Sequence, residues 1–226
     1  MRYNKVVPAV FLDRPNRFIA EVELEGHVER VHVKNTGRCR ELLVPGCRCY
    51  LSDSGNFLRK TRYDLIAVEK GERLINMDSQ VVNTLVEEFL AGGGLFSPEA
   101  KVRREVTFGK SRFDFYIEDG SRKIFLEVKG VTLENNGVAA FPDAPTERGV
   151  KHLKELVAAC EKGYESYVFF VIQMKNVKYF TPNDVTHPAF GEALREASAR
   201  GVRLVAMECL VKPHQLVIDG NVEIKL

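Results

Sequence analysis

The sequence of 226 residues has no apolar run long enough to cross a bilayer. It also lacks a charged start followed by a hydrophobic stretch and a cleavage site, so we expect a cytoplasmic protein with no membrane partner. The formal net charge is only +2, which by itself does not mark a nucleic-acid-binding protein. Any basic surface must therefore be local. The chain is long enough for one large domain or two modest ones.

Several motifs that define common classes of site are missing. The cysteines number five and never form a C-x-x-C pair, which predicts neither a disulfide framework nor a zinc site. Cys47 and Cys49 share one face of a probable strand and are expected to be small hydrophobic residues. The histidines show no H-E-x-x-H spacing, and there is no Walker loop, G-x-G-x-x-G after a strand, or G-x-S-x-G elbow.

The first part of the chain, residues 1–79, is predicted to be all-β. Residues 18–24 and 28–33 alternate around a Glu25-Gly26 turn, which is typical of a hairpin. Residues 40–44 are consistent with one helical turn. Three further strands are expected at residues 48–51, 64–69 and 74–77. Five short strands with a small helical insert favour a five-stranded barrel of the OB type, with a small β-sandwich as the alternative.

The second part, residues 80–226, alternates between strands and helices. The expected elements are a helix at 83–90, a strand at 102–108, a hairpin at 111–117 and 123–130, an irregular stretch at 134–145, a helix from the N-cap Thr146 to Gly163, a strand at 167–174, a helix at 188–200 and a strand at 203–207. This order predicts a three-layer α/β domain.

The hairpin carries charged side chains among apolar ones. Side chains alternate along a strand. In the first strand, one face is predicted to hold Phe113, Phe115 and Ile117, and the opposite face Arg112, Asp114 and Tyr116. In the second strand, one face is predicted to hold Ile124, Leu126 and Val128, and the opposite face Phe125, Glu127 and Lys129. Pairing of the strands would bring Asp114, Glu127 and Lys129 to one spot. Two carboxylates and an ammonium there are costly unless something binds them, and a divalent cation would do so.

Magnesium prefers hard oxygen ligands and keeps several waters, so one or two carboxylates and a substrate phosphate are sufficient. Asp114 and Glu127 would be metal ligands and catalytic groups, with the main-chain carbonyl of Val128 as an extra ligand for Mg²⁺ or Mn²⁺. Lys129 would be catalytic by orienting the attacking water or neutralising phosphate oxygen. The alternative is an exposed cross-strand ion pair of Glu127 and Lys129, which contributes little.

These residues carry a resemblance. Phe113-Asp114 followed by Glu127-Val128-Lys129 resembles the PD-(D/E)xK nuclease motif, with Phe in place of the usual proline. The chain more specifically resembles the sugar fermentation stimulation protein A family, through residues 35–37, 82–84, 111–115, 127–133 and 141–153. The resemblance implies an N-terminal OB-fold, a C-terminal nuclease-like domain and DNA binding. Phosphodiester hydrolysis is implied by the nuclease-like motif.

The resemblance also bears on residues around the hairpin. Glu105 on the preceding strand matches a glutamate of the family and is the favoured third metal ligand. Glu87 and Glu88, on the first helix, are the alternatives. Arg148, Lys151 and His152 lie in the most characteristic stretch and are assigned to DNA binding, where a helix start also favours phosphate. Without the resemblance these three would be a solvated helix face.

In the first domain, the predicted DNA contacts are cationic. Those assigned to DNA binding are Arg17, Lys34, Arg38, Arg40 and Arg62. Phe57 and Tyr63 offer stacking platforms, whereas Phe18 is expected in the core because it opens an alternating strand. No recognition helix is visible, so binding is expected to be largely independent of sequence.

The expected partner is DNA, with duplex favoured over single strands, and a homodimer is compatible with the sequence. Two hypotheses follow for what the protein does with DNA. It is either a metal-dependent DNA nuclease, or a DNA-binding regulatory or architectural protein whose nuclease-like domain is catalytically silent.

Overall fold

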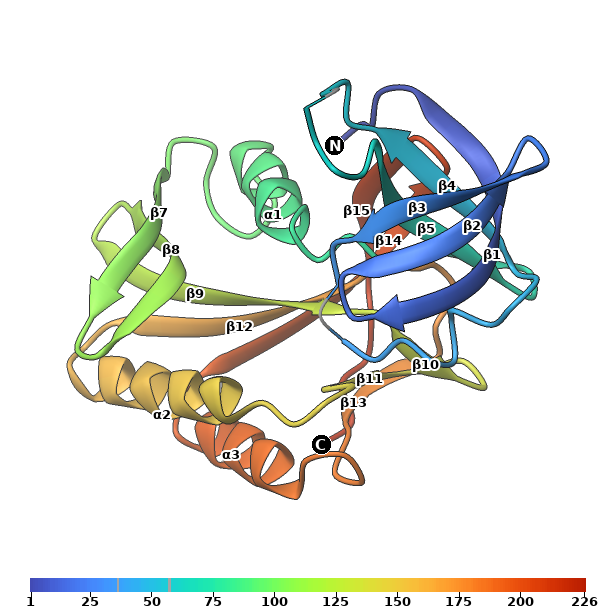
Figure 1. The fold of residues 1–226 in the computed structure, drawn as a ribbon. Coiled ribbons are helices and arrows are strands. Elements are labelled where there is room, and N and C mark those ends of the chain that lie inside the picture. The colour runs from blue at the N-terminus through green and yellow to red at the C-terminus, as the bar shows by residue number, and fades with distance from the viewer. Residues whose placement is uncertain (36, 57) are drawn as a thin grey trace.

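The computed structural model describes residues 1–35, 37–56 and 58–226 and shows a β-barrel joined to an α/β domain (Figure 1). The strands of the first part are β1 (Val6–Asn16), β2 (Ile19–Leu24), β3 (His27–Val33), β4 (Arg48–Asp53), β5 (Tyr63–Lys70) and β6 (Arg73–Asn76). They are ordered β3-β2-β1-β4-β5-β6, and a further pairing of β3 with β5 closes the barrel. Closure confirms the OB-type barrel over the sandwich.

The composition of the barrel differs from the prediction in one strand. No strand is predicted from the sequence at Val6–Asn16, yet β1 is the longest strand of the barrel and pairs with both β2 and β4. Pro8 and Pro15 weaken the strand signal there because proline cannot donate to a ladder. The predicted strand at residues 74–77 corresponds to β6, which pairs only with β5 and lies outside the closed barrel.

The α/β domain is built on a six-stranded sheet ordered β15-β14-β12-β9-β8-β7. Its elements are α1 (Val82–Ala91), β7 (Lys101–Phe108), β8 (Ser111–Asp119), β9 (Arg122–Val131), α2 (Glu147–Glu161), β12 (Glu165–Ile172), α3 (Pro188–Ala199), β14 (Arg203–Lys212) and β15 (Gln215–Asn221). Helix α1 covers one face of the sheet, while α2 and α3 cover the other (Figure 1). The predicted three layers are therefore present.

A second, small sheet occupies a stretch that was expected to be irregular. Strands β10 (Leu133–Asn135) and β11 (Val138–Phe141) form a hairpin, and β11 pairs in parallel with β13 (Tyr179–Pro182). The prediction was wrong here. The β10–β11 hairpin is local, but β11 also pairs with β13, about 40 residues away in the chain, and short-range patterning does not show such pairing. Strand β15, antiparallel to β14, was not predicted either.

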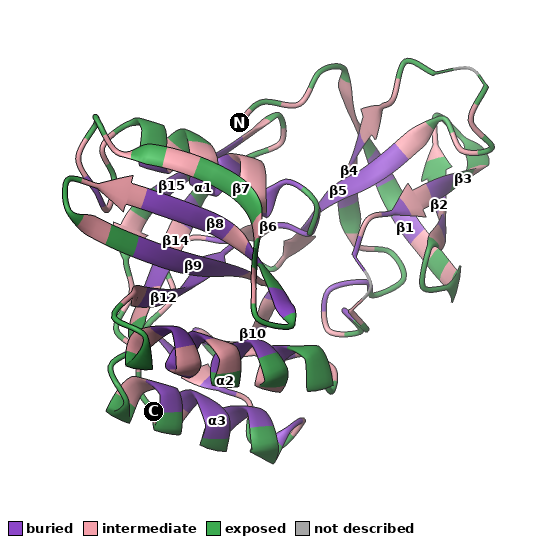
Figure 2. Cartoon of the chain, turned by 90° about the vertical axis from the view of Figure 1, so that its left-hand side faces the viewer, coloured by how far each residue is buried: buried purple, intermediate pink, exposed green. Residues whose placement is uncertain are grey.

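Buried side chains fill both faces of the main sheet. Figure 2 shows β8 and β9 largely buried, whereas the edge strand β7 is mostly exposed. On the α1 side, Phe115, Leu126 and Phe169 belong to one apolar cluster. The cluster on the α2 and α3 side includes Phe170 and Phe180, whose rings stack with centroids 4.2 Å apart.

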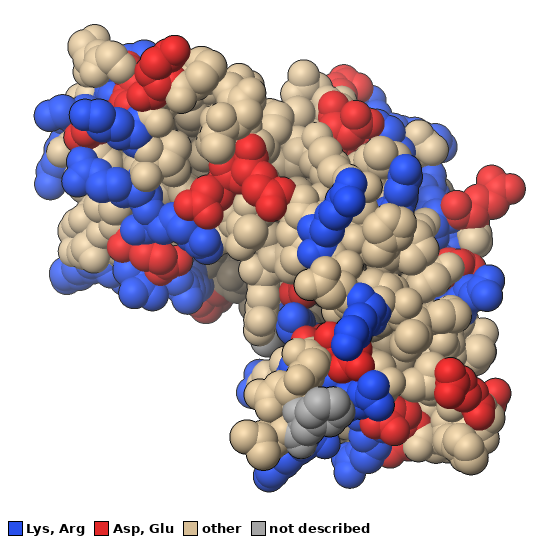
Figure 3. Space-filling model, turned by 90° about the horizontal axis from the view of Figure 1, so that it is seen from above, with Lys and Arg blue, Asp and Glu red and all other residues tan. Residues whose placement is uncertain are grey.

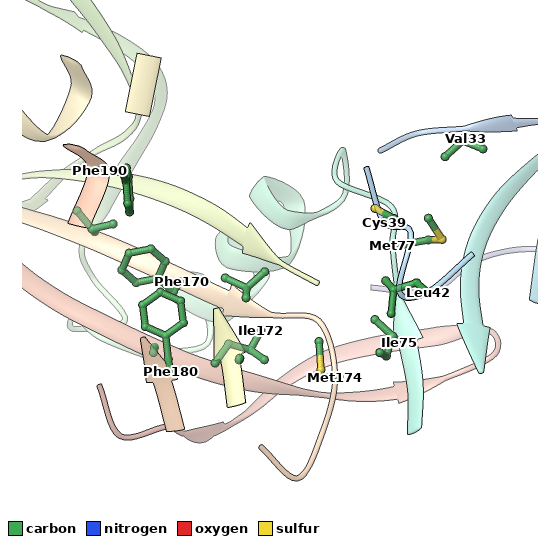
Figure 4. Packing of buried hydrophobic residues seen from close by; sticks show 14 of the residues in the cluster. Val33, Cys39, Leu42, Ile75, Met77, Phe170, Ile172, Met174, Phe180 and Phe190 are labelled. Atoms are coloured by element: carbon green, nitrogen blue, oxygen red, sulfur yellow. The ribbon is translucent and has the colours of Figure 1, made fainter. Parts of the chain in front are cut away.

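That second cluster continues into the barrel, so the two domains share a core. Ile172 and Met174 lead from the sheet to Ile75 and Met77, and onward to Leu42 in the barrel (Figure 4). The main-chain N–H of Asn76 also donates to the carbonyl of Gln173 at 2.9 Å. The N-terminal segment also contacts the α/β domain, because Arg2 forms an isolated β-bridge with Gln215 at the start of β15. The barrel and the α/β domain are therefore packed directly against each other.

No helix in the described ranges is both long and apolar enough to span a membrane.

Candidate active site

The site forms where β8 separates from β9. The ladder between these strands runs only as far as Phe115 and Leu126, and beyond that point β8 and β9 no longer pair with each other. Phe113 packs against Phe125 and His152 on the α2 side, whereas Phe115 lies in the α1-side cluster. The predicted grouping of Phe113 with Phe115 and of Asp114 with Tyr116 was therefore wrong, because β8 departs from regular alternation at Asp114. Alternation along β9 is as predicted.

The side chain of Asp114 hydrogen-bonds to β9 where the main chain of β8 no longer does. Its Oδ2 accepts a hydrogen bond from the main-chain N–H of Val128 at 2.8 Å, and its Oδ1 accepts one from Asn83 Nδ2 at 2.8 Å. Asn83 comes from α1, so Asp114 is held on the α1 side of the sheet. Because the N–H and carbonyl of one strand residue point to the same side, the Val128 carbonyl faces the opening between the strands.

Glu127 reaches the opening from the α2 side. Its Oε1 accepts hydrogen bonds from Lys129 Nζ and His152 Nδ1, each at 2.5 Å. Its Oε2 is buried and has no hydrogen-bond partner among the described residues, and Glu127 as a whole is only 4% exposed. An orphaned carboxylate oxygen in a buried position is costly unless a further group binds it.

The two carboxylates line one pocket with an internal volume of about 510 Å³. Lys129, Arg104 and Arg148 also line it, so two acids lie among cations from three different elements. The structure therefore brings Asp114, Glu127, Val128 and Lys129 together, with Arg148 at the same pocket. Asn83 and Arg104 were not predicted as site residues; Asn83 lies within one of the stretches that carry the family resemblance.

The pKa values of the two carboxyl groups are shifted in opposite directions. Burial, followed by the negative charge of Glu127, raises the pKa of Asp114 above its ordinary value. Burial also opposes ionisation of Glu127, but the charge of Lys129 and the hydrogen bond from His152 outweigh it and lower the pKa of Glu127. The pocket thus holds one carboxylate that stays charged and one whose charge needs compensation.

This donor set fits a hard divalent cation. The orphaned Glu127 Oε2, the carboxylate of Asp114 and the carbonyl of Val128 are oxygen donors of the kind that Mg²⁺, Mn²⁺ and Ca²⁺ prefer. Within the described ranges, no three His, Cys, Asp or Glu residues converge as a metal-binding group. Water or a phosphate oxygen must therefore complete the coordination, as is usual for magnesium.

The candidate third ligand, Glu105, does not line this pocket. Arg104 pairs with Phe115 and Val106 with Phe113, so Glu105 stands opposite Asp114 in the register. Its backbone, however, is left-handed (φ 57°), and its carboxylate forms an ion pair with Arg112 Nε at 2.7 Å. Of the alternatives, Glu87 contacts Arg104 and Glu88 contacts the N-terminal amine.

Helix α2 carries the three residues predicted to bind DNA at its start, and the prediction is wrong for one of them, His152. Thr146 caps it as expected, since its Oγ1 accepts from the N–H of Gly149 at 3.1 Å. Arg148 and Lys151 are exposed and line a second pocket together with Lys110 and Arg112. His152 was predicted to be exposed and to bind DNA, but it is 4% exposed and bonded to Glu127. His152 therefore holds the Glu127 carboxylate in place and does not contact phosphate.

The predicted cations of the barrel fall into two groups. Arg17, Arg38 and Arg40 are exposed, and so is Arg62, although it is paired with Asp53 at 2.8 Å. Lys34 is half-buried and contacts Asp64 and Asp78 at 3.0 and 3.4 Å, which makes it a poor candidate for a phosphate contact. The face seen in Figure 3 carries cations interspersed with acidic side chains on both lobes of the molecule.

The predicted stacking residues have different surroundings. Phe18 was expected in the core but is 45% exposed, and the Arg17 guanidinium lies 4.9 Å from its ring centroid. Tyr63 is half-buried, and the Arg62 guanidinium lies 5.0 Å from its ring centroid. Phe57 lies outside the described residues. The Arg17–Phe18 pair is therefore the exposed aromatic site on the barrel that the structure offers for a nucleobase.

An OB barrel joined to an α/β domain with an Asp–Glu–Lys pocket defines a class of nuclease-like proteins. Residues 12–77 match the family described as the SfsA N-terminal OB domain, and residues 80–215 match the sugar fermentation stimulation protein RE domain. The chain belongs to this sugar fermentation stimulation protein family.

Individual relatives agree over the whole chain. A sugar fermentation stimulation protein homolog from Desulfitobacterium hafniense (strain DSM 10664 / DCB-2) is 56% identical over 226 residues, covering 100% of this chain and 99% of the relative. A homolog from Ruminiclostridium cellulolyticum is 52% identical and both chains are fully covered. The structure of Pyrococcus furiosus SfsA in complex with Ca²⁺ superposes with a TM-score of 0.90 at 29% identity, covering 100% of this chain and 98% of the other.

Proposed function

We propose that the protein binds DNA largely without regard to sequence and hydrolyses its phosphodiester bonds with Mg²⁺ or Mn²⁺ at the Asp114–Glu127 pocket. The observation that carries the proposal is the buried Glu127 Oε2, which has no hydrogen-bond partner within residues 1–35, 37–56 and 58–226 and lines a pocket together with a second carboxylate. The OB and nuclease-like domains support nucleic acid as the partner. The calcium complex of the Pyrococcus furiosus relative supports a divalent cation.

Each side chain has a separate task in this proposal. Asp114, Glu127 and the Val128 carbonyl hold the cation, which when bound supplies Lewis-acid polarisation and a water of lowered pKa. Lys129, anchored at 2.5 Å on Glu127, orients the attacking water and offsets charge on the phosphate. Arg148 and Lys151 bind flanking phosphates at the start of α2, whose dipole adds to their charge.

A plasmid-nicking assay with MgCl₂ or MnCl₂ tests hydrolysis. Wild-type protein should nick supercoiled DNA, whereas Asp114→Asn and Glu127→Gln should each lower the rate about 100-fold or more, because each removes a charged ligand. Glu192→Gln, which changes an exposed carboxylate on α3, is the matched control and should cut normally. Cutting that survives both substitutions would identify a contaminating nuclease.

The alternative is a DNA-binding protein whose nuclease-like domain is catalytically silent. The surroundings of Asp114 are compatible with this, because both of its carboxylate oxygens already accept hydrogen bonds, from the Val128 N–H and from Asn83. Wild-type protein that binds DNA with normal affinity, yet nicks no plasmid with either metal, would support this alternative.

A further inference from the structure

A separate cavity of about 450 Å³ lies between the barrel and the α/β domain. Asn35 and Gly37 contribute from the barrel, and residues 140–146 contribute from β11 and the loop that leads to α2. The two sides are tied together, since the main-chain N–H of Cys39 donates to Asp143 Oδ2 at 3.3 Å. Two of the stretches that carry the family resemblance thus face each other across a space that the metal pocket does not use.

This interdomain cavity adjoins the Asp114–Glu127 pocket. Ser79, Gly130, Phe141 and Thr146 line both spaces. A ligand group in the interdomain cavity and a phosphate beside the carboxylates can therefore belong to the same or neighbouring nucleotides. A nucleotide has this division, because its phosphate and its base are joined through one sugar.

The wall of the cavity contains a buried acceptor with a fixed orientation. Gln173 is fully buried, and its Nε2 donates to Asn76 Oδ1 at 2.8 Å and to the carbonyl of Asp78 at 3.0 Å. Those two bonds orient the amide, and its Oε1 accepts no hydrogen bond from the part of the chain that the structure describes. Oε1 lies against Gly130, where an added Cβ would come within 2.8 Å of it. Glycine at position 130 keeps the approach to this acceptor open.

The remaining lining carries one charge of each sign and suits a neutral ring. Asp143 places a carboxylate in the wall, and Arg17 contributes a guanidinium from the barrel, so neither sign of charge dominates the cavity. Leu133, Phe141, Pro142 and Pro145 supply apolar surfaces beside these polar groups. Apolar surfaces combined with fixed polar atoms are typical of sites for small organic ligands. An amino group on a flat heterocycle satisfies both the apolar surfaces and the Gln173 acceptor.

We propose that the interdomain cavity binds a nucleobase that carries an amino group, from the nucleotide whose phosphate occupies the Asp114–Glu127 pocket. This inference rests on the proposed function and specifies its substrate, because a base in the cavity must leave the duplex stack. The protein therefore acts on unpaired or locally opened strands at the nucleotide it holds.

Calorimetric titration of the full chain in CaCl₂ tests this, with dAMP and 2-deoxyribose 5-phosphate as the two probes. Wild-type protein should bind dAMP at least about tenfold more tightly than the sugar phosphate, since a bound base adds stacking and hydrogen bonding. Ala144→Leu, which fills the cavity, should reduce the affinity for dAMP to that of the sugar phosphate. It should leave the affinities for the sugar phosphate and calcium unchanged.

Ala158→Leu on α2 is the matched control, because Ala158 is also half-buried and lies outside both pockets. It should bind dAMP as wild type does. Equal affinity of wild type for the two probes, or unchanged dAMP binding in a folded Ala144→Leu protein, overturns the base site while calcium binding stands. If calcium and both probes fail to bind to wild type, the proposed function fails and this inference fails with it.

Discussion

Glu127 shows how one side chain collects the support of several others. Lys129 and His152 both donate to its Oε1, and this leaves Oε2 as the atom available to a ligand. The same two donors keep Glu127 ionised in a buried position, which an isolated glutamate would not tolerate. His152 therefore acts on the site through the carboxylate that it holds.

Replacement of His152 tests this supporting role. His152→Phe should lower the affinity for Ca²⁺ about tenfold, because loss of a partner behind a ligand costs 10–100-fold in metal affinity. Isothermal titration of the apoprotein with CaCl₂ measures the change. His32→Phe is a control, since His32 bonds Asp64 in the barrel at 3.2 Å and should leave the calcium affinity unaltered. Equal affinities in both variants would contradict the role of His152.

Glu105 provides a second test at this scale. Its carboxylate is paired with Arg112 and does not line the pocket, so Glu105→Ala should leave the calcium affinity within about twofold of wild type. The same titration measures this. A loss as large as that of Glu127→Gln would show instead that Glu105 turns toward the cation when it binds.

Among the elements, the pairing of β3 with β5 closes the barrel through only two residue pairs, His32 with Asp64 and Val33 with Leu65. Asp64 reinforces this short junction because Arg59 and Lys34 contact it at 2.6 and 3.0 Å. Burial opposes ionisation of Asp64, but the hydrogen bonds from Arg59 and Lys34 outweigh burial and lower its pKa. An ion cluster thus supplements a ladder that is too short to hold by itself.

Asp64→Asn should therefore lower the free energy of unfolding by about 3 kcal/mol at neutral pH. This is the lower end of the cost of breaking a buried ion pair, and it applies because Lys34 and Arg59 stay partly solvated. A lowered folded-state pKa stabilises the protein above the ordinary pKa of about 3.9 and loses that effect as the pH falls through the folded value. The difference between variant and wild type should shrink on acidification below pH of about 4. Urea titrations at several pH values measure it, and a constant difference would argue against the ion cluster.

At the scale of the whole molecule, the surface charge sets the terms of DNA binding. Basic residues are distributed over both domains rather than gathered on one element, as Figure 3 shows for one face. The net charge of +2 means that attraction to DNA has to come from local contacts such as Arg148 beside the pocket. Each such contact releases counterions and adds to the dependence of binding on salt.

Substitution of these cations should change the salt dependence in a countable way. Arg148→Ala and Arg38→Ala should each weaken DNA binding and lower the slope of log K against log salt by roughly 1. Fluorescence anisotropy over a salt series measures both quantities. Arg195→Ala, on α3 and paired with Asp184 at 3.0 Å, is the control and should leave the slope unchanged. Slopes equal to wild type in all three variants would remove Arg38 and Arg148 from the interface.

The sequence predicted those features that depend on neighbours along the chain. The hairpin of β8 and β9, the Thr146 cap and the alternation of Phe125, Glu127 and Lys129 all follow from short-range spacing. Strand β1 was missed because its prolines weaken the strand signal, and the pairing of β11 with β13 was missed because these strands are far apart in the chain. The same reason explains His152, whose burial depends on where α2 packs against β9.

By itself, the sequence determined the family, the two kinds of domain and the acid, acid and lysine spacing on the hairpin, because these are written in residue types at short range. Only the tertiary structure decided how the acids meet. Strand β8 leaves β9 at Asp114, so one carboxylate comes from the α1 side and the other from the α2 side. Packing of the barrel against the sheet also decided that Gln173 and residues 140–146 enclose a second cavity, since each domain supplies only part of its wall.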